Sequence, residues 1–391
     1  MSAVQAALRA DGIDGWLLYD FRGINPIAND VTGAGRQGGH LATRRWFYLI
    51  PADGEPRALV HAIESRTLAH LPGSTIQYAG RTQLEQGLCR TLSGLQRVAM
   101  EYSPGCAIPY VARVDGGTLE LVRSCGVDVI SSGDLVQCFS AVWDADDIAA
   151  HRTASDKVHR IKDRAFDAIA RLVRDAGETT EYEIQTRILD WFREEGLVSD
   201  ADPNVSAAEN AGNPHYQPTR DHARRIGPGE LVLLDIWAKL ASPGAVFADI
   251  TWVGFTGSQV PDRFARAFTV IREARDAAIA LVQTAARTGR AVRGFEVDRE
   301  ASAVIRAAGY GDHILHRTGH SLGAEAVHGT GVNMDDYETH DDRRLITGTG
   351  FTIEPGIYFP DFGVRTEINM VMGAHEATVS GPLQTDILAL A

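Results

Sequence analysis

HRTGHSLG, at residues 316–323, is followed by TIEPGIY at 352–358 and GVRTEIN at 363–369. These stretches contain, in turn, His320, Glu354 and Glu367. Each of the three stands in a context that gives few other reasons for a charge, and Glu354, for example, lies between Ile353 and Pro355-Gly356. Burying a charge is costly unless it is paired or bound to a metal. The three residues are therefore the first candidates for a functional site.

The spacing of the two glutamates predicts a hairpin. Glu354 and Glu367 are 13 positions apart, and Pro360-Asp361 lies midway as a turn. In that register the two side chains face each other across antiparallel strands, with Cβ atoms roughly 4.5–5.5 Å apart. Two bare carboxylates so close repel each other, which a divalent cation relieves. The neutral ring of His320 suits transition metals as a further ligand.

A second pair of carboxylates lies upstream. Asp235 interrupts the apolar run LVLLDIW, and Asp249 interrupts AVFADITWVGF. Their midpoint is Ser242, beside the turn residues Pro243-Gly244. We therefore expect a hairpin in which the two aspartates face each other. Four carboxylates and one histidine suffice for two cations, which in hydrolases lie roughly 3.5–4 Å apart.

The order Asp, Asp, His, Glu, Glu, with GHSLG, TIEPGIY and GVRTE around the last three, resembles the prolidases and aminopeptidases P. These are proline-peptide-cleaving metallopeptidases of the pita-bread fold, related to methionine aminopeptidase and creatinase. The resemblance is close from Asp144 to the C-terminus and loose before it. It implies an α+β protein, with an α/β creatinase-type N-terminal domain at 1–142 and a pita-bread catalytic domain at 143–391.

The resemblance also assigns roles. The metal ligands would be Asp235, Asp249, His320, Glu354 and Glu367, with Asp249 and Glu367 bridging two divalent ions. Manganese is the first choice, and cobalt, zinc or iron also suit oxygen-rich ligands with one histidine. Glu354 would also be the general base. No other cofactor is expected.

Three further residues have expected roles around the ligands. Residues 364–370 alternate apolar and polar, so a strand would turn Arg365 and Glu367 to one face, where Arg365 orients the glutamate. The resemblance implies that His215 and His328 contact the substrate and stabilise the tetrahedral intermediate. His316 would hold a hydrogen bond behind the ligands, because Gly319 and Gly323 argue against a helix carrying both histidines.

The chain departs from the family pattern in three places. One extra residue separates His320 from His328, and Ser321 replaces the glycine of the GHG motif. The two aspartates are also farther apart than usual. None of these changes removes a ligand, but they bear on the position of His328 and on the proline pocket. The acidic segment 332–344 is expected to be a solvated loop.

The N-terminal region predicts an α/β domain that opens with a helix at 3–10 and a strand at 15–20. A loop is expected at 21–45. It contains Gly33-x-Gly35-x-x-Gly38, a formal dinucleotide fingerprint without the helix that should follow it, so a plain loop is preferred. Its arginines (Arg22, Arg36, Arg44 and Arg45) suggest another hypothesis, that the loop reaches a partner subunit's cleft and limits substrate length.

Composition narrows the class of protein. The net charge of −13 argues against nucleic acid or an anionic membrane as the main partner. No apolar run of 18 residues exists, and the four cysteines lack CxxC spacing. We expect Cys89, Cys106, Cys125 and Cys138 to be reduced, in a cytoplasmic protein.

The leading hypothesis is a homodimeric Xaa-Pro dipeptidase acting on proline-containing peptides. Aminopeptidase P, which cleaves longer peptides, is the alternative within the same chemistry. Methionine aminopeptidase is disfavoured because it needs no such N-terminal domain, and a metal-free creatinase-like hydrolase because all five ligand positions are intact. A pita-bread protein that binds peptides without catalysis is the remaining alternative.

Overall fold

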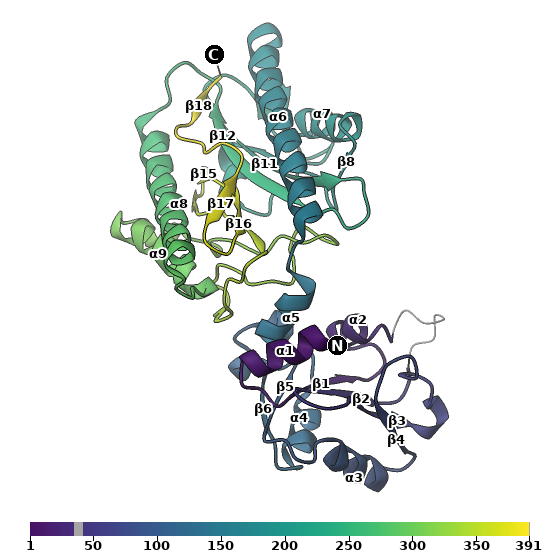
Figure 1. Ribbon diagram of the computed structural model, residues 1–391. Coiled ribbons are helices and arrows are strands. Elements are labelled where there is room, and N and C mark those ends of the chain that lie inside the picture. Colours follow the sequence, from purple (N-terminus) through teal and green to yellow (C-terminus); the bar gives the residue numbers. More distant parts are fainter. Residues whose placement is uncertain (35–41, 391) are drawn as a thin grey trace. The chain divides into compact units, whose positions relative to one another are not determined.

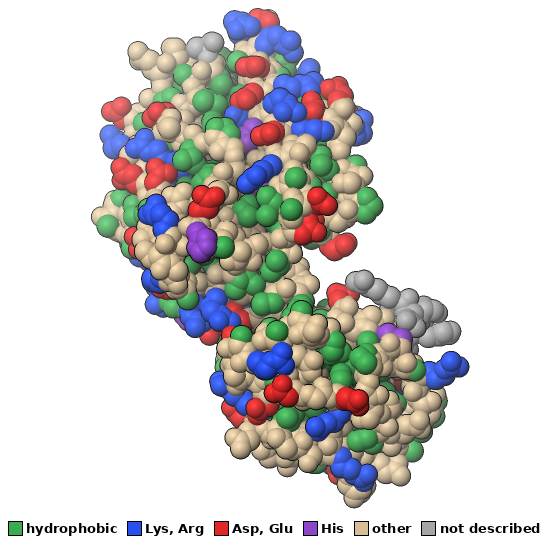
Figure 2. All heavy atoms as spheres, viewed as in Figure 1, with side chains coloured by type: hydrophobic (Ala, Val, Ile, Leu, Met, Phe, Trp, Pro, Cys, Tyr) green, Lys and Arg blue, Asp and Glu red, His purple; other side chains and the backbone are tan. Residues whose placement is uncertain are grey.

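The computed structural model describes residues 1–34 and 42–390. The chain forms two compact units, Met1–Phe139 and Ser140–Ala391. In the described ranges no helix is long and apolar enough to cross a membrane. On the face drawn in Figure 2, acidic and basic side chains are interspersed over the larger unit rather than gathered by sign.

The N-terminal unit is a six-stranded mixed sheet in the order β4-β3-β2-β1-β5-β6, covered on both faces by helices (Figure 1). Along β1, Trp16 and Leu18 pack with α1 and α2, whereas Leu17 and Tyr19 pack with α3 and α4. Alternation along a strand buried on both faces explains its continuous apolar sequence. The strands are β1 (Gly15–Asp20), β2 (Trp46–Pro51), β3 (Arg57–His61), β4 (Ser74–Tyr78), β5 (Arg97–Met100) and β6 (Asp128–Ser131). The helices are α1 (Ser2–Ala10), α2 (Pro26–Thr32), α3 (Arg81–Thr91), α4 (Gly116–Arg123), α5 (Gly133–Ser140), and the short 3-10 turns η1 (Ala62–Glu64), η2 (Pro104–Cys106) and η3 (Pro109–Val111).

The prediction of an uninterrupted loop at 21–45 is wrong, because it contains α2. The Asn25 side chain caps this helix by accepting from the Ala28 N–H at 3.1 Å. Gly33 ends it in the left-handed region, with φ 68°. In a dinucleotide fingerprint the first glycine precedes a helix instead, so Gly33 does not fit that motif. Residues 35–41 of the proposed length-limiting loop, with Arg36, Gly35 and Gly38 among them, lie outside the described residues.

The prediction of four reduced cysteines is also wrong. Cys89 in α3 and Cys125, just past α4, form a disulfide with an S–S distance of 2.06 Å. The two cysteines are 36 residues apart, and only the packing of the two helices on one sheet face brings them together. Cys106 and Cys138 are not part of a disulfide in the described part of the chain. The cytoplasmic location loses this part of its basis and stays a prediction.

The larger unit has two halves, each with a pair of helices packed on strands (Figure 1). In the first half, α6 (Ala145–Ala176) and α7 (Glu181–Glu194) cover one face of the sheet built on β9 (Asn204–Ala207), β11 (Leu231–Leu240) and β12 (Ala248–Phe255). The second half has α8 (Asp262–Thr288) and α9 (Gly294–Ala307) with β13 (Gly350–Ile353), β14 (Gly356–Phe359), β15 (Phe362–Arg365), β16 (Ile368–Met372) and β17 (Ala377–Ser380). Short elements complete it: β7 (Thr179–Thr180), β8 (Leu197–Val198), β10 (Arg225–Ile226), β18 (Leu388–Ala389), η4 (Ala208–Gly212) and η5 (Gly311–His313).

The predicted register of the aspartate hairpin is wrong by two residues. Asp235 lies opposite Thr251, and Asp249 lies opposite Trp237. The cause is the connection 241–247, whose last three residues, Ala245–Phe247, are buried rather than part of a tight turn. A slip of two residues keeps every side chain on its face. Both aspartates therefore still point to the same side of β11 and β12.

The predicted glutamate hairpin is confirmed. Phe359 pairs with Phe362 around the Pro360-Asp361 turn. The β13–β16 ladder continues the same register up to the Ile353–Ile368 pair. Glu354 and Glu367 stand opposite each other in the gap between the two ladders.

Gly363 gives a test of how tightly this hairpin packs. A Cβ on Gly363 would lie 1.9 Å from the Ala211 carbonyl oxygen of η4, and the backbone there cannot easily move away. We expect Gly363→Ala to lower the free energy of unfolding by about 1–3 kcal/mol, as overpacking does. Urea denaturation measures it. Gly227→Ala is the control, since a Cβ there meets nothing within 4 Å, and equal losses for both variants would contradict the assignment.

Candidate metal centre

Three predicted ligands from different strands and loops converge in the larger unit. One ligand atom from each of Asp249, His320 and Glu367 lies within 4.8 Å of the others, and all three residues are buried. Asp249 comes from β12, Glu367 precedes β16, and His320 lies in the extended segment before β13. Backbone hydrogen bonds join these segments. The Glu367 N–H donates to the Thr251 carbonyl at 3.1 Å, and the Thr352 N–H donates to the His320 carbonyl at 2.9 Å.

Local packing fixes the ring of His320. Gly319 lets its backbone approach β13, since a Cβ there would lie 2.2 Å from the Thr352 carbonyl oxygen. The Nδ1 of His320 is 3.0 Å from the Ser321 carbonyl oxygen. A carbonyl only accepts, so Nδ1 carries the hydrogen and Nε2 keeps its lone pair. This is the form in which a histidine binds a metal.

The distances around Nε2 match a shared cation. His320 Nε2 lies 3.5 Å from Asp249 Oδ2 and 3.6 Å from Glu354 Oε1. Two atoms that bind one cation through bonds of about 2.0–2.2 Å lie roughly 3–3.5 Å apart. Asp249 Oδ1 is buried and has no hydrogen-bond partner among the described residues. A buried carboxylate oxygen left unpaired, beside an imidazole lone pair and further carboxylates, is a donor set that fits divalent cations.

Asp235 joins the cluster through Arg365. The Arg365 guanidinium pairs with the Asp235 carboxylate, donates to Thr251 Oγ1 at 2.9 Å and to the Tyr358 hydroxyl at 3.1 Å. The prediction that Arg365 bonds Glu367 directly is wrong. Thr251 stands between them and donates to Glu367 Oε2 at 2.7 Å.

His316 lies behind the ligands, as expected. Its Nδ1 is 2.6 Å from the Arg317 carbonyl, so that nitrogen carries the hydrogen, and Nε2 accepts from the Tyr358 hydroxyl at 2.7 Å. The chain from His316 through Tyr358 to Arg365 therefore ends on the Asp235 carboxylate.

Three carboxyls of the cluster hold their protons more tightly than usual. Burial raises the pKa of Asp235 to about 7, despite the neighbouring guanidinium. Burial also raises the pKa of Asp249. The pKa of Glu367 rises well above its usual range, because of burial first and then the charge of Asp249. So many buried carboxylates cannot all be ionised without added positive charge.

Glu354 behaves differently. Burial works to raise its pKa, but His320, His316 and Arg365 outweigh it and the pKa is lowered. Burial likewise opposes the charged form of His320, but Asp249 and Glu354 outweigh it and raise the pKa of the ring. Glu354 is thus the carboxylate of the cluster most easily kept ionised.

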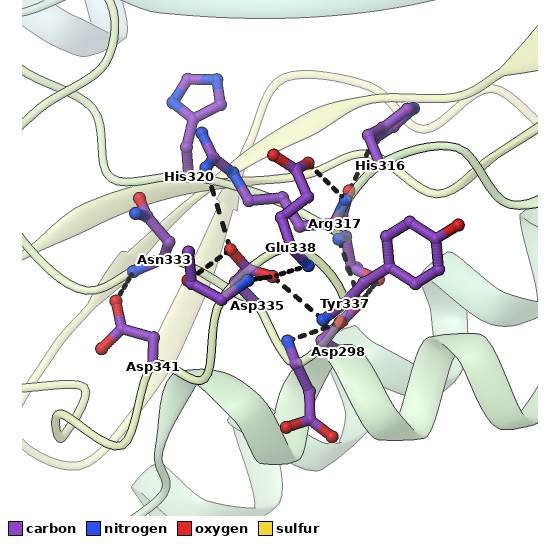
Figure 3. A network of polar contacts seen from close by, with 12 residues as sticks. Asp298, His316, Arg317, His320, Asn333, Asp335, Tyr337, Glu338 and Asp341 are labelled. Atoms are coloured by element: carbon purple, nitrogen blue, oxygen red, sulfur yellow. Dashed lines mark hydrogen bonds and ion pairs between the residues drawn. The ribbon is translucent and has the colours of Figure 1, made fainter. Parts of the chain in front are cut away.

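The prediction that 332–344 is a solvated acidic loop is wrong for two of its acidic residues. Asp335 and Asp341 are fully buried. Figure 3 shows the Asp335 carboxylate enclosed by backbone N–H groups, and it accepts from Tyr337 and Glu338 at 3.0 and 2.9 Å. Arg317 reaches the same carboxylate, at 3.9 Å. Close by, Asp298 accepts from the Thr318 N–H at 3.0 Å (Figure 3). These acids thus anchor the segment that carries His320.

The structure brings His328, but not His215, into contact with a predicted ligand. The rings of His328 and His320 have centroids 4.1 Å apart. That neighbour first, and burial second, lower the pKa of His328 to about 4. His215 is exposed in the loop after η4, and its ring bonds no described residue. Its N–H donates to Asn213 Oδ1 at 3.1 Å.

Sequence reasoning missed several polar residues of the site. Thr251 lies two positions after Asp249 on a strand, so alternation alone would place it on the ligand face. Asn369 donates to the Asp249 carbonyl at 2.5 Å and accepts from its N–H at 2.9 Å, which fixes Asp249. Tyr358 offered no signal beyond its motif.

Known proteins with similar sequences agree with this geometry. The sequence model of metallopeptidase family M24 matches residues 154–374, more than half of the 391. The chain belongs to metallopeptidase family M24. An Xaa-Pro dipeptidase of Lactobacillus helveticus is 34% identical over 207 residues, 52% of this chain and 49% of that protein. One of Lactobacillus delbrueckii subsp. lactis is 31% identical over 210 residues, again 52% and 49%. The chain spans about half the length of the curated relatives it matches.

Solved structures confirm the predicted fold class. The dipeptidase PepE from Mycobacterium ulcerans is 21% identical, with a TM-score of 0.66 over 100% of this chain and 96% of that one. An X-Pro aminopeptidase from Thermotoga maritima is 20% identical, with a TM-score of 0.54 over 98% and 99%. This M24 chain is thus prolidase-like, with the α+β pita-bread fold, and its family implies divalent metal ions.

The shifted pKa values predict how the metal and pH act together on stability. Asp235, Asp249 and Glu367 have folded pKa values raised above the unfolded values of about 4, so the native metal-free protein binds more protons. That protein should therefore lose stability as the pH rises from about 4 through 7. His320, with a raised pKa, acts in the same direction, and the lowered pKa of Glu354 opposes it.

Divalent metal should reverse this loss, because its ligands must be deprotonated. We expect Mn²⁺ to raise the unfolding temperature more at pH 8 than at pH 5, and Asp249→Asn to reduce that gain. Thermal unfolding by circular dichroism, with and without chelator, measures both. An equal gain at the two pH values would contradict the assignment of these carboxyls as ligands.

Proposed function

We propose that the chain is a dinuclear-metal-dependent peptidase that hydrolyses the peptide bond before proline, in Xaa-Pro dipeptides first of all. The observation that carries the proposal is the convergence of Asp249, His320 and Glu367, with Glu354 and Asp235 beside them. The catalytic domain is residues 143–391 and the creatinase-type domain residues 1–142. The division into compact units between Phe139 and Ser140 supports these bounds.

Asp235, Asp249, His320, Glu354 and Glu367 would hold two divalent ions, manganese by preference. Bound there, such ions lower the pKa of a water and polarise the scissile carbonyl. The protein's part is to present the ligands in the right form. The hydrogen on Nδ1 of His320 leaves Nε2 to bind, and the Thr251 hydroxyl and the Asn369 amide fix Glu367 and Asp249.

Glu354 is the proposed general base. Its lowered pKa keeps it ionised at neutral pH, so it can accept a proton from the attacking water and pass it to the leaving nitrogen. The Glu354 N–H donates to the Thr318 carbonyl at 2.7 Å, and its Oε1 accepts from Thr352 Oγ1 at 3.2 Å. These bonds hold the carboxylate in place without neutralising it.

His328 and His215 are the proposed contacts to the substrate. The low pKa of His328 keeps it neutral at pH 7, when it can donate one hydrogen bond to the oxygen of the tetrahedral intermediate. His215 is proposed on the family resemblance of NPHY, and its exposure leaves its ring free to bind a peptide. Arg365 serves by holding Asp235.

The preference for dipeptides rests on the two Lactobacillus relatives, both Xaa-Pro dipeptidases. Aminopeptidase activity on longer peptides is the second candidate, and the fold of the Thermotoga X-Pro aminopeptidase allows it. The homodimer is proposed on family resemblance. A peptide-binding role without catalysis is disfavoured because no ligand has been lost.

The first experiment assays manganese-loaded protein on an Xaa-Pro dipeptide and an Xaa-Pro-Yaa tripeptide, with product release followed by chromatography. We expect dipeptide cleavage, and a loss of kcat of about 10²–10⁴-fold in Glu354→Gln, the range attributed to general bases. Because Glu354 is also a proposed ligand, the metal content of the variant is measured by mass spectrometry alongside.

Each outcome decides between the candidates. Cleavage of the tripeptide alone would establish the aminopeptidase and contradict the dipeptide proposal. Stoichiometric metal without cleavage of either peptide would contradict the peptidase. Protein without bound metal would favour the non-catalytic binding module.

A further inference from the structure

A single carboxylate outside the metal ligands joins two walls of the candidate site. Asp200, in the connection between β8 and β9, accepts from the Trp237 indole N–H at 2.7 Å through Oδ1. Its other oxygen, Oδ2, accepts from the backbone N–H of Val327 at 2.9 Å. One side chain thus links a strand of the sheet to the residue next to His328.

The strand end of this link belongs to the metal centre. Trp237 lies two residues after Asp235 on β11, so both side chains are on the same face. It is also the ladder partner of Asp249. A bond to the Trp237 indole is therefore fixed in position relative to two proposed ligands.

The other end of the link is a short exposed loop. The Gly323 N–H donates to the Val327 carbonyl at 3.2 Å, and the Gly329 N–H donates to the Ser321 carbonyl at 2.7 Å. Between these bonds Glu325 and Ala326 are exposed. The Asp200 carboxylate ties this loop to the sheet through the Val327 N–H, and the Lys239 ammonium of β11 ties it a second time by donating to the Ala324 carbonyl.

We infer that Asp200 is a positioning residue that holds His328 against the metal ligand His320. The inference rests on the proposed function, in which His328 touches the substrate. His328 directly follows Val327, so the bond from the Val327 N–H to Asp200 restrains the backbone that carries the His328 ring. In this arrangement the ring centroids of His328 and His320 are 4.1 Å apart.

A purely structural role for Asp200, in shaping the β8–β9 connection, predicts something else. It would lower stability without acting through His328. A double-mutant cycle distinguishes the two hypotheses, because residues that act through one another give non-additive losses of kcat.

The cycle compares Asp200→Ala, His328→Ala and the double variant in the manganese-loaded protein. We expect Asp200→Ala to lower kcat by about tenfold, a cost of about 1.4 kcal/mol, with metal content unchanged. In the His328→Ala background, Asp200→Ala should lower kcat hardly at all. Asp202→Ala is the matched control, since this exposed carboxylate two residues on bonds no described side chain. Additive losses, or no loss in His328→Ala, would overturn the inference.

Trp237→Phe removes the indole N–H from which Asp200 accepts, together with part of the ring system, and keeps an aromatic side chain at this position. We expect a smaller loss of kcat than in Asp200→Ala, again absent when His328 is alanine. The phenyl ring is smaller than the indole, so urea denaturation of the variant measures any loss of stability separately. A loss of kcat that persists in the His328→Ala background would show that Trp237 does not act through His328.

A readout without turnover separates this inference from the proposed function. In the cobalt-loaded protein, proton NMR shows paramagnetically shifted signals, and those that His328→Ala removes belong to its ring. We expect Asp200→Ala to move or broaden them and Asp202→Ala to leave them. If the signals of the His328 ring do not change in Asp200→Ala, the inference that Asp200 positions His328 is wrong, even if peptides are cleaved. If the signals change but no peptide is cleaved, that inference holds and the proposed substrate is wrong.

Discussion

The mutual repulsion of four carboxylates, two of them buried and two partly buried, is the constraint on which the centre depends. Asp235, Asp249, Glu354 and Glu367 share a site with one guanidinium and the imidazole of His320. Burial raises the pKa of three of them, Asp235, Asp249 and Glu367, so it favours the protonated forms of these three carboxyls. The surrounding strands hold these groups together anyway, through bonds to the backbone of Thr251 and Asp249. Holding like charges together at this site lowers the stability of the fold. The site therefore requires added positive charge, such as a bound cation, to function.

The two hairpins show how far spacing predicts geometry. The Glu354–Glu367 pairing followed from a two-residue turn at Pro360-Asp361, because such a turn sets the register directly. The Asp235–Asp249 pairing failed because Ala245–Phe247, read as strand entry, is buried connection. Even so, a register error of an even number of residues leaves each side chain on the same face of the sheet. The set of ligands could therefore be predicted, whereas the residues that lie directly opposite one another could not.

Other features depended on partners that lie far away in the sequence. The Cys89–Cys125 disulfide needs α3 and α4 on one face of a sheet, which spacing does not reveal. The acidic segment 332–344 was expected to be solvated because clustered acidic side chains usually face solvent. Asp335 is buried because backbone N–H groups of its own turn, and Arg317, satisfy it. Sequence patterns predict which face of a strand a residue lies on and where turns occur. They do not predict how many backbone N–H groups will donate to a given carboxylate.

That distinction gives the acidic composition a physical meaning. Glu181, fully buried at the start of α7, accepts from the Ala207 and Arg224 N–H groups at 2.7 Å each and from the Tyr216 hydroxyl at 2.5 Å. It thereby fixes both ends of the segment that carries His215. Asp200 and Asp335 act in the same way on other loops. A carboxylate that accepts from backbone amides orders a loop without needing a cation, so part of the excess of 51 acidic over 38 basic residues is internal framework. The net charge of −13 therefore says more about how the loops around the metal centre are held than about the charge of the substrate.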